Sequence, residues 1–265
     1  MWTDYTCLEG LEVIEPKRCL QGPYETVFLD VGETLVHLEP SFVISVRAIG
    51  LDFGVERVPN DFDNGLRSIW ASHVRATRSV GHSLTTQASS RYWHQTYARV
   101  GTFLGVDDVE GFSHALYERF TSYAAYAPMP GAIDVLRCLN RLGLRVIVAS
   151  NWEGWLGRLL DELGLDRFFA GQAVSADVGF EKPDRRFFDA AVEISGTDRS
   201  RTVHVGDSLE ADVQGALSAG IDAVWLASSR AEDAPVPVIS SITELPGILK
   251  PYIAPVSWAL PSATC

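Results

Sequence analysis

Short apolar runs alternate with helix-like stripes over the second half of the chain. Beyond Pro130, the runs predict strands at 146–149, 173–175, 202–205 and 223–226. The segments between them place apolar residues at helical spacing, as at Leu156, Leu159, Leu160 and Leu163. Apolar strands that alternate with amphipathic helices predict a parallel sheet covered on both faces. A further run at 26–29 predicts a buried strand that ends at Asp30.

The middle of the chain has a different pattern. Helical periodicity, without a convincing strand, occupies segments 41–50, 61–78, 89–104 and 109–123. We therefore expect an α/β core interrupted by an inserted all-helical domain. We predict an N-terminal extension at 1–24 and a core formed by 25–39 and 128–249. The helical insert occupies 40–127, and a C-terminal tail follows at 250–265.

Composition narrows the classes of function. The 265 residues are 46% hydrophobic and 21% charged, which is typical of a globular protein, and the net charge is −12. An acidic chain without a basic patch predicts no nucleic-acid partner, and the absence of a long apolar run predicts no membrane partner. The start of the chain has no basic region followed by an apolar one, so we expect a cytoplasmic protein. The four cysteines form no CxxC pair, so we expect reduced thiols. Neither composition nor pattern indicates the oligomeric state.

Polar side chains gather where the predicted strands end. Ligands of such sheets bind beyond the carboxyl ends of the strands, and there the sequence places Asp30, Ser150, Asn151, Asp207 and, in loops nearby, Lys182 and Asp212. A carboxylate can attack phosphorus, and a pair of carboxylates can hold Mg²⁺. An ammonium and a hydroxyl can neutralise and orient phosphoryl oxygens. The set therefore predicts phosphoryl transfer. His204, inside a predicted strand, is interpreted as a packing residue.

Four short motifs carry a resemblance to a known family. They are DVGET at 30–34, VIVASN at 146–151, EKPD at 181–184 and GDSLEAD at 206–212. In this order and spacing the chain resembles the haloacid dehalogenase-like hydrolase superfamily. The insert agrees in place and size with the helical C1 cap of that superfamily. The resemblance implies a Rossmann-like α/β core and an Mg²⁺-dependent phosphatase that acts on a small phosphate ester.

The resemblance also implies roles for single residues. Asp30 is the expected nucleophile. Asp30, Asp207 and the backbone carbonyl of Gly32 are the expected Mg²⁺ ligands. Ser150 and Lys182 are expected to act in catalysis and to bind the phosphoryl group.

Three supporting roles complete this set. Asn151 and Thr34 are expected to assist in binding the phosphoryl group, and Thr34 also to support its loop through the hydroxyl. Asp212 is expected to orient Lys182 or the waters of the metal.

One position departs from the family pattern. The second Asp of the first motif, the usual general acid and base, is Gly32 here. Its loss removes about 10²–10⁴ in rate where a leaving group needs a proton, and the neighbouring Glu33 points in another direction. A protein that binds a phosphorylated ligand or a partner, with weak or no catalysis, is therefore an alternative function. A 2-haloacid dehalogenase is a third candidate. The branch of the superfamily that cleaves C–P bonds needs a lysine in its cap, which forms a Schiff base. Residues 40–127 contain no lysine, so this branch is excluded.

Overall fold

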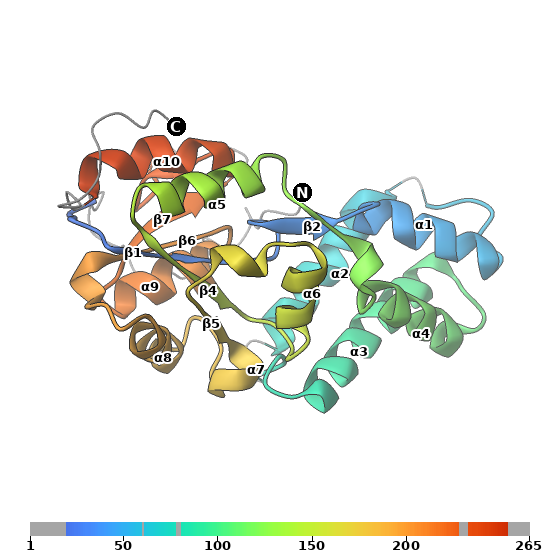
Figure 1. The fold of residues 1–265 in the computed structure, drawn as a ribbon. Helices are drawn as coiled ribbons and strands as arrows, with labels where there is room; N and C mark the ends of the chain where they lie inside the picture. The colour runs from blue at the N-terminus through green and yellow to red at the C-terminus, as the bar shows by residue number, and fades with distance from the viewer. Residues whose placement is uncertain (1–19, 60, 78–80, 228–232, 254–265) are drawn as a thin grey trace. The chain divides into compact units, whose positions relative to one another are not determined.

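The computed structural model describes residues 20–59, 61–77, 81–227 and 233–253 (Figure 1). The predicted N-terminal extension and C-terminal tail lie largely outside these ranges. The described chain forms two compact units, one of residues 20–36 with 128–253 and the other of residues 37–127.

A parallel sheet of six strands is the centre of the first unit. The strands lie in the order β5-β4-β1-β6-β7-β8, and every neighbouring pair is parallel. Their bounds are β1 (Thr26–Leu29), β4 (Arg145–Ser150), β5 (Gly171–Val174), β6 (Thr202–Gly206), β7 (Asp222–Leu226) and β8 (Val238–Ile239). The predicted α/β class is confirmed. The sequence pattern missed β8, because two residues are too few to show a period.

Helices cover both faces of this sheet. Figure 1 shows α5 and α10 over one face and α8 and α9 over the other. The helices of this unit are α5 (Ala132–Arg141), α6 (Leu156–Glu162), α7 (Ser175–Val178), α8 (Arg185–Ser195), α9 (Gly215–Ser218) and α10 (Leu245–Leu249). Short 3₁₀ turns are η2 (Asp166–Phe168), η3 (Arg199–Arg201), η5 (Ile242–Glu244) and η6 (Lys250–Tyr252). On the face of α8 and α9, the buried core includes Phe28, Ile147, Phe187, Phe188 and Val213.

The helical segment after Asp207 has an unusual first half. A π-helical segment, η4, covers Leu209–Gln214, and regular α-helix follows only in α9. The Ser208 hydroxyl accepts a hydrogen bond from the backbone N–H of Ala211, which caps the segment. Gly215 allows close packing, because a Cβ there would lie 2.8 Å from the Phe188 ring and 3.0 Å from the Pro183 backbone. Wide turns of this kind often occur at functional sites.

Cys138 corrects one expectation from the sequence. Its side chain is buried on α5, and it is disulfide-bonded rather than reduced. A disulfide requires the two Cα atoms to lie about 4.4–6.8 Å apart, and cysteine spacing along a chain does not reveal such a distance. The other three cysteines lie outside the described residues.

The described part of the second unit contains four α-helices. They are α1 (Phe42–Asp52), α2 (Phe62–Thr77), α3 (Thr86–Leu104) and α4 (Val109–Phe120), with the turn η1 (Tyr123–Ala125) after them. Their apolar faces meet in a core that includes Val46, Phe62, Leu66, Tyr97, Phe112 and Leu116. The Thr85 and Asp108 side chains cap α3 and α4. Strands β2 (Val36–Leu38) and β3 (Tyr126–Pro128) pair where the chain passes between the units.

The described helices were compared with the length and apolar composition of a membrane-spanning helix. Within the described ranges, none combines the length and the apolar composition that a bilayer crossing requires.

Candidate active site

The polar residues predicted at the strand ends meet at the carboxyl end of the sheet. Asp30 follows β1, and its backbone N–H continues the ladder to Val205 of β6 at 2.9 Å. Ser150 is the last residue of β4, and Asp207 follows β6. Because β1 lies between β4 and β6, the Ser150 and Asp207 side chains lie on either side of Asp30.

Lys182 is the cation of this cluster. Its ammonium donates to Asp30 Oδ1 at 2.7 Å, to Asp212 Oδ1 at 2.5 Å and to the Ala149 carbonyl at 2.8 Å. Its side chain is 2% exposed. An ammonium carries three protons, so all of its donors are used and its direction is fixed.

The two oxygens of Asp30 differ in their surroundings. Oδ1 accepts hydrogen bonds from Lys182 and from the Ser150 hydroxyl, the latter at 2.9 Å. No described residue donates a hydrogen bond to Oδ2. The side chain is 10% exposed, so the carboxylate is anchored through one oxygen, and the other is left for a reacting atom.

Asn151 holds a loop rather than presenting its side chain to a ligand. Its amide nitrogen donates to the Lys182 carbonyl at 2.9 Å, and its amide oxygen accepts from the Lys182 N–H at 2.7 Å. These two bonds fix the backbone from which the Lys182 side chain extends. The side-chain amide of Asn151 is therefore engaged within the fold.

The turn after β1 positions Thr34. Val31 accepts backbone hydrogen bonds from Thr34, Leu35 and Val36, and Glu33 adopts a left-handed conformation with φ 53°. The side chain of Glu33 is exposed, whereas Thr34 is fully buried. No described residue forms a hydrogen bond with the Thr34 hydroxyl. A buried hydroxyl without a partner carries a cost, which a bound ligand could offset.

Gly32 lies against an indole ring. A Cβ at this position would be 3.3 Å from Cζ3 of Trp152. The backbone of Trp152 is held in turn by the Ser175 hydroxyl, which bonds both its N–H and its carbonyl, at 2.9 and 3.0 Å. An aspartate at position 32 would therefore have to shift the Trp152 ring by a few tenths of an ångström.

Asp30, Asp207 and Asp212 form the acidic part of the site. One carboxylate oxygen from each lies within 4.8 Å of the others. These three carboxylates face one ammonium, which leaves an excess of two negative charges. Hard oxygen donors with that excess fit a divalent cation such as Mg²⁺. The acidic residues here therefore fit the metal that the sequence predicts.

The pKa values of the cluster follow from burial and from Lys182. Burial raises the pKa of Asp30, although Lys182 opposes the rise. Burial and the neighbouring Asp30 and Asp212 charges raise the pKa of Asp207 well above its usual range. Burial also acts on Asp212, but Lys182 and His204 outweigh it and hold its pKa below the usual range. The pKa of Lys182 is raised, because the two carboxylates outweigh its burial.

Two residues that sequence reasoning missed support this cluster. His204 of β6 places Nε2 2.8 Å from Asp212 Oδ1, so it is more than the packing residue that its strand position suggested. Trp225 of β7 donates its indole N–H to the Asp207 carbonyl at 2.8 Å. The sequence held a hint of this role for His204, because it lies two residues before the GDSLEAD motif, on the strand that leads into Asp207.

Gly206 makes room for the acidic cluster. A Cβ there would lie 2.2 Å from Cγ of Asp212, so only glycine fits at the end of β6. Oδ2 of Asp212 accepts the Ser208 N–H at 2.9 Å, which holds the carboxylate against this glycine.

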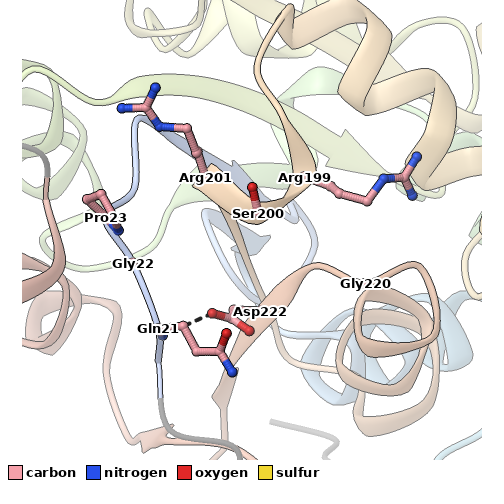
Figure 2. A pocket seen from close by; sticks show the side chains of 8 residues that line it. All are labelled: Gln21, Gly22, Pro23, Arg199, Ser200, Arg201, Gly220 and Asp222. Atoms are coloured by element: carbon pink, nitrogen blue, oxygen red, sulfur yellow. Dashed lines mark hydrogen bonds between the residues drawn. The ribbon is translucent and has the colours of Figure 1, made fainter.

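A separate pocket lies at the amino end of the sheet. Its volume is about 390 Å³. The lining comes from the segments that precede β1 and β6, at residues 21–23 and 199–201, from Gly220, and from Asp222 at the start of β7. Figure 2 shows the guanidinium groups of Arg199 and Arg201 pointing away from each other. They pair with Asp189 and Glu25. The pocket therefore does not offer converging cations to an anion.

Comparison with known proteins places this geometry in a family. The sequence model of the haloacid dehalogenase-like hydrolases matches residues 24–220. The chain belongs to this family. The human haloacid dehalogenase-like hydrolase domain-containing protein 3 is 27% identical over 242 residues, which cover 89% of this chain and 92% of the human protein. The pyrimidine 5'-nucleotidase YjjG of Escherichia coli K12 is 28% identical over 234 residues, 85% of this chain and 98% of that protein.

Other relatives cover less of the chain or share only the fold. The phosphoglycolate phosphatase of Agrobacterium fabrum is 36% identical over 116 residues, 41% of this chain and 49% of that enzyme. Among solved structures, the HAD-hydrolase YfnB of Bacillus subtilis bound to magnesium has a TM-score of 0.67 at 22% identity. It covers 85% of this chain and 98% of its own. This hydrolase family thus includes relatives that are named as phosphatases and as a nucleotidase.

Proposed function

We propose that the chain is an Mg²⁺-dependent phosphatase of a small phosphorylated metabolite, acting through an aspartyl-phosphate. The observation that carries this proposal is the asymmetry of Asp30, which is anchored through Oδ1 and open at Oδ2. A nucleophile needs this combination of fixed position and a free oxygen. The names of the nucleotidase and phosphatase relatives support the class of substrate.

The chemistry divides into two displacements at phosphorus. Asp30 attacks in line, so its O–P bond forms while the O–P bond to the leaving alcohol breaks. Water then attacks the same phosphorus, which breaks the Asp30 bond and releases inorganic phosphate. Lys182 and Ser150 hold the attacking carboxylate through hydrogen bonds to Oδ1, and the positive charge of Lys182 offsets negative charge that develops at the phosphoryl group. Asp30, Asp207 and the Gly32 carbonyl would hold Mg²⁺, which would supply further positive charge at the phosphoryl group.

The proton of the leaving alcohol has no donor at position 32. Gly32 carries no acid, and the side chain of Glu33 is exposed. This observation favours a second candidate function, namely a protein that binds a phosphorylated ligand with weak or no turnover. The third candidate, a 2-haloacid dehalogenase, would use Asp30 to displace halide without metal.

One assay separates these candidates. The purified chain is tested on a panel of phosphate esters and 2-haloacids, with Mg²⁺ and with a chelator, beside Asp30→Asn. We expect ester hydrolysis that the chelator abolishes and that Asp30→Asn lowers by about 10⁴-fold or more. Asp134→Asn is the matched control, because that carboxylate is 82% exposed and pairs with Arg137 on the same helix. It should leave turnover unchanged.

The other outcomes are equally distinct. Ester hydrolysis that survives Asp30→Asn would overturn the proposed nucleophile. Binding of a phosphate ester without turnover would support the binding protein. Halide release in chelator would support the dehalogenase.

A further inference from the structure

His204 is a polar side chain in an apolar setting. It lies in the middle of β6, is fully buried, and in the sheet is flanked by Phe28 and Ala223. The ring of Phe188 meets the imidazole edge to face, with ring centroids 5.4 Å apart. An apolar side chain would satisfy these neighbours without the cost of burying a polar ring.

The two nitrogens of His204 have unequal surroundings. Nε2 lies 2.8 Å from Asp212 Oδ1, and Nδ1 has no hydrogen-bond partner among the described residues. Because a carboxylate only accepts, Nε2 carries the proton and donates it. The fold therefore leaves one buried nitrogen unsatisfied, which costs folding free energy. Packing does not explain why a histidine is kept at that cost.

The hydrogen bond of His204 reaches a carboxylate that is otherwise held from two sides. Asp212 Oδ1 also accepts from the Lys182 ammonium, and Oδ2 accepts from the Ser208 N–H. Donors at both oxygens prevent the carboxylate from turning about its Cβ–Cγ bond. Without His204, Oδ1 would be held by Lys182 alone, the group that it has to orient.

We propose that His204 is a positioning residue, which acts through Asp212 to hold the Lys182 ammonium against Asp30. The contacts form one chain from the His204 imidazole to Asp212, to Lys182 and to Oδ1 of Asp30. His204 touches neither substrate nor reacting atom in this scheme. The catalytic consequence rests on the proposed phosphatase function, whereas the positioning itself does not.

Two substitutions separate positioning from packing. His204→Gln keeps an N–H donor at about the reach of Nε2, but it places a flexible polar amide in the core. His204→Leu has no donor, but it suits the apolar face. Positioning predicts that Leu lowers kcat by about 10- to 100-fold, the range seen for residues that orient catalytic ligands, and that Gln stays within about threefold of wild type. A packing role predicts the reverse order.

A second measurement needs no turnover. The chain has three lysines, so Lys17→Arg with Lys250→Arg leaves Lys182 as the source of the lysine ammonium signal in ¹⁵N NMR. We expect a slowly exchanging Lys182 signal in this background. His204→Leu should accelerate its hydrogen exchange at least tenfold, and His204→Gln should preserve it.

The outcomes test the two proposals separately. An unchanged Lys182 signal in His204→Leu overturns the positioning role, as does a kcat that tolerates Leu better than Gln. A background protein that hydrolyses no ester overturns the phosphatase, but the exchange measurement still decides the role of His204. Urea unfolding of both variants verifies that each is folded before the rates are compared.

Discussion

The two ends of the central sheet carry similar charged groups in different environments. At the carboxyl end, Lys182 pairs with Asp30 and Asp212, and the three side chains are 2%, 10% and 2% exposed. At the amino end, Arg201 pairs with Glu25 at 2.7 Å, but these side chains are 42% and 44% exposed. Water screens the exposed pair of Arg201 and Glu25. The buried charges of Lys182, Asp30 and Asp212 have lost their water, so they depend on one another for stabilisation.

The difference in burial indicates which charged groups serve function and which have little effect on stability. Desolvated charges cost free energy to assemble, so a fold that keeps several of them in one place uses them for chemistry. Exposed pairs cost little and contribute little. The carboxyl end is therefore the place where the chain gives up stability for an arrangement of charge, and three substitution experiments test that conclusion.

The largest effect is expected from removing the central cation. Lys182→Met leaves buried carboxylates without a counter-charge, so the free energy of unfolding should fall by about 3–5 kcal/mol, and turnover should be lost. Arg201→Met removes the exposed pair at the other end and should cost less than about 1 kcal/mol. Urea unfolding at neutral pH without metal measures both. Equal losses in the two variants would contradict the contrast between the ends.

Removing one hydroxyl at each end of the sheet should change the free energy of unfolding in opposite directions. The Tyr24 hydroxyl donates to Asp222 at 2.5 Å at the amino end, whereas the buried Thr34 hydroxyl has no partner among the described residues. Tyr24→Phe should lower the free energy of unfolding by about 1–3 kcal/mol, and Thr34→Val should raise it by about 1 kcal/mol. Thermal unfolding of the two variants beside wild type gives both signs, and a destabilised Thr34→Val would mean that its hydroxyl is satisfied.

The Tyr24 effect also depends on pH. Burial, followed by the hydrogen bond and charge of Asp222, raises the pKa of Tyr24 above its ordinary value. The neutral phenol is therefore favoured in the folded state, so its contribution is complete below pH ~10, the unfolded pKa, and declines as pH rises beyond it. The stability difference between wild type and Tyr24→Phe should shrink above pH ~10. A constant difference up to pH ~11 would contradict this linkage.

The smallest effect is expected two residues from Lys182. Asp184 caps α8 and pairs with Arg186 at 2.6 Å, but these side chains are 36% and 66% exposed. Asp184→Asn keeps a capping side chain and loses only the ion pair, so we expect less than about 1 kcal/mol. The hydrogen bonds from Arg186 lower the pKa of Asp184, so any loss should be seen above pH ~4 and vanish as the pH falls below it. Urea unfolding at pH 3 and pH 7 checks both statements.

Sequence periodicity was enough to predict most of the fold. The apolar run at 146–149 falls inside β4, and the stripe of Leu156, Leu159 and Leu160 becomes the buried side of α6. The two-residue β8 and the three-residue β2 and β3 escaped, because so few residues show no period. The π-helical η4 escaped as well, since its widening depends on tertiary contacts rather than on the residues of one turn.

The candidate site was predicted as a set of residues but not as a set of contacts. Asp30, Ser150, Lys182 and Asp212 were expected at one end of the sheet, and the structure brings them within hydrogen-bond distance. Asn151 was expected to assist in binding the phosphoryl group, and its side-chain amide binds the Lys182 backbone. His204 was expected to pack. Strand alternation assigns a face to each residue but not a partner, and for both residues the partner lies on another segment.

The reciprocal bonds between Asn151 and the Lys182 backbone have a consequence for engineering. They imitate one rung of a β-ladder, built from a side chain, between segments 31 residues apart in the chain. A carboxylate in place of the amide could not imitate both halves of that rung, because it has no proton to give. Any graft that exchanges the loop after β4 must therefore carry the loop before α8 with it.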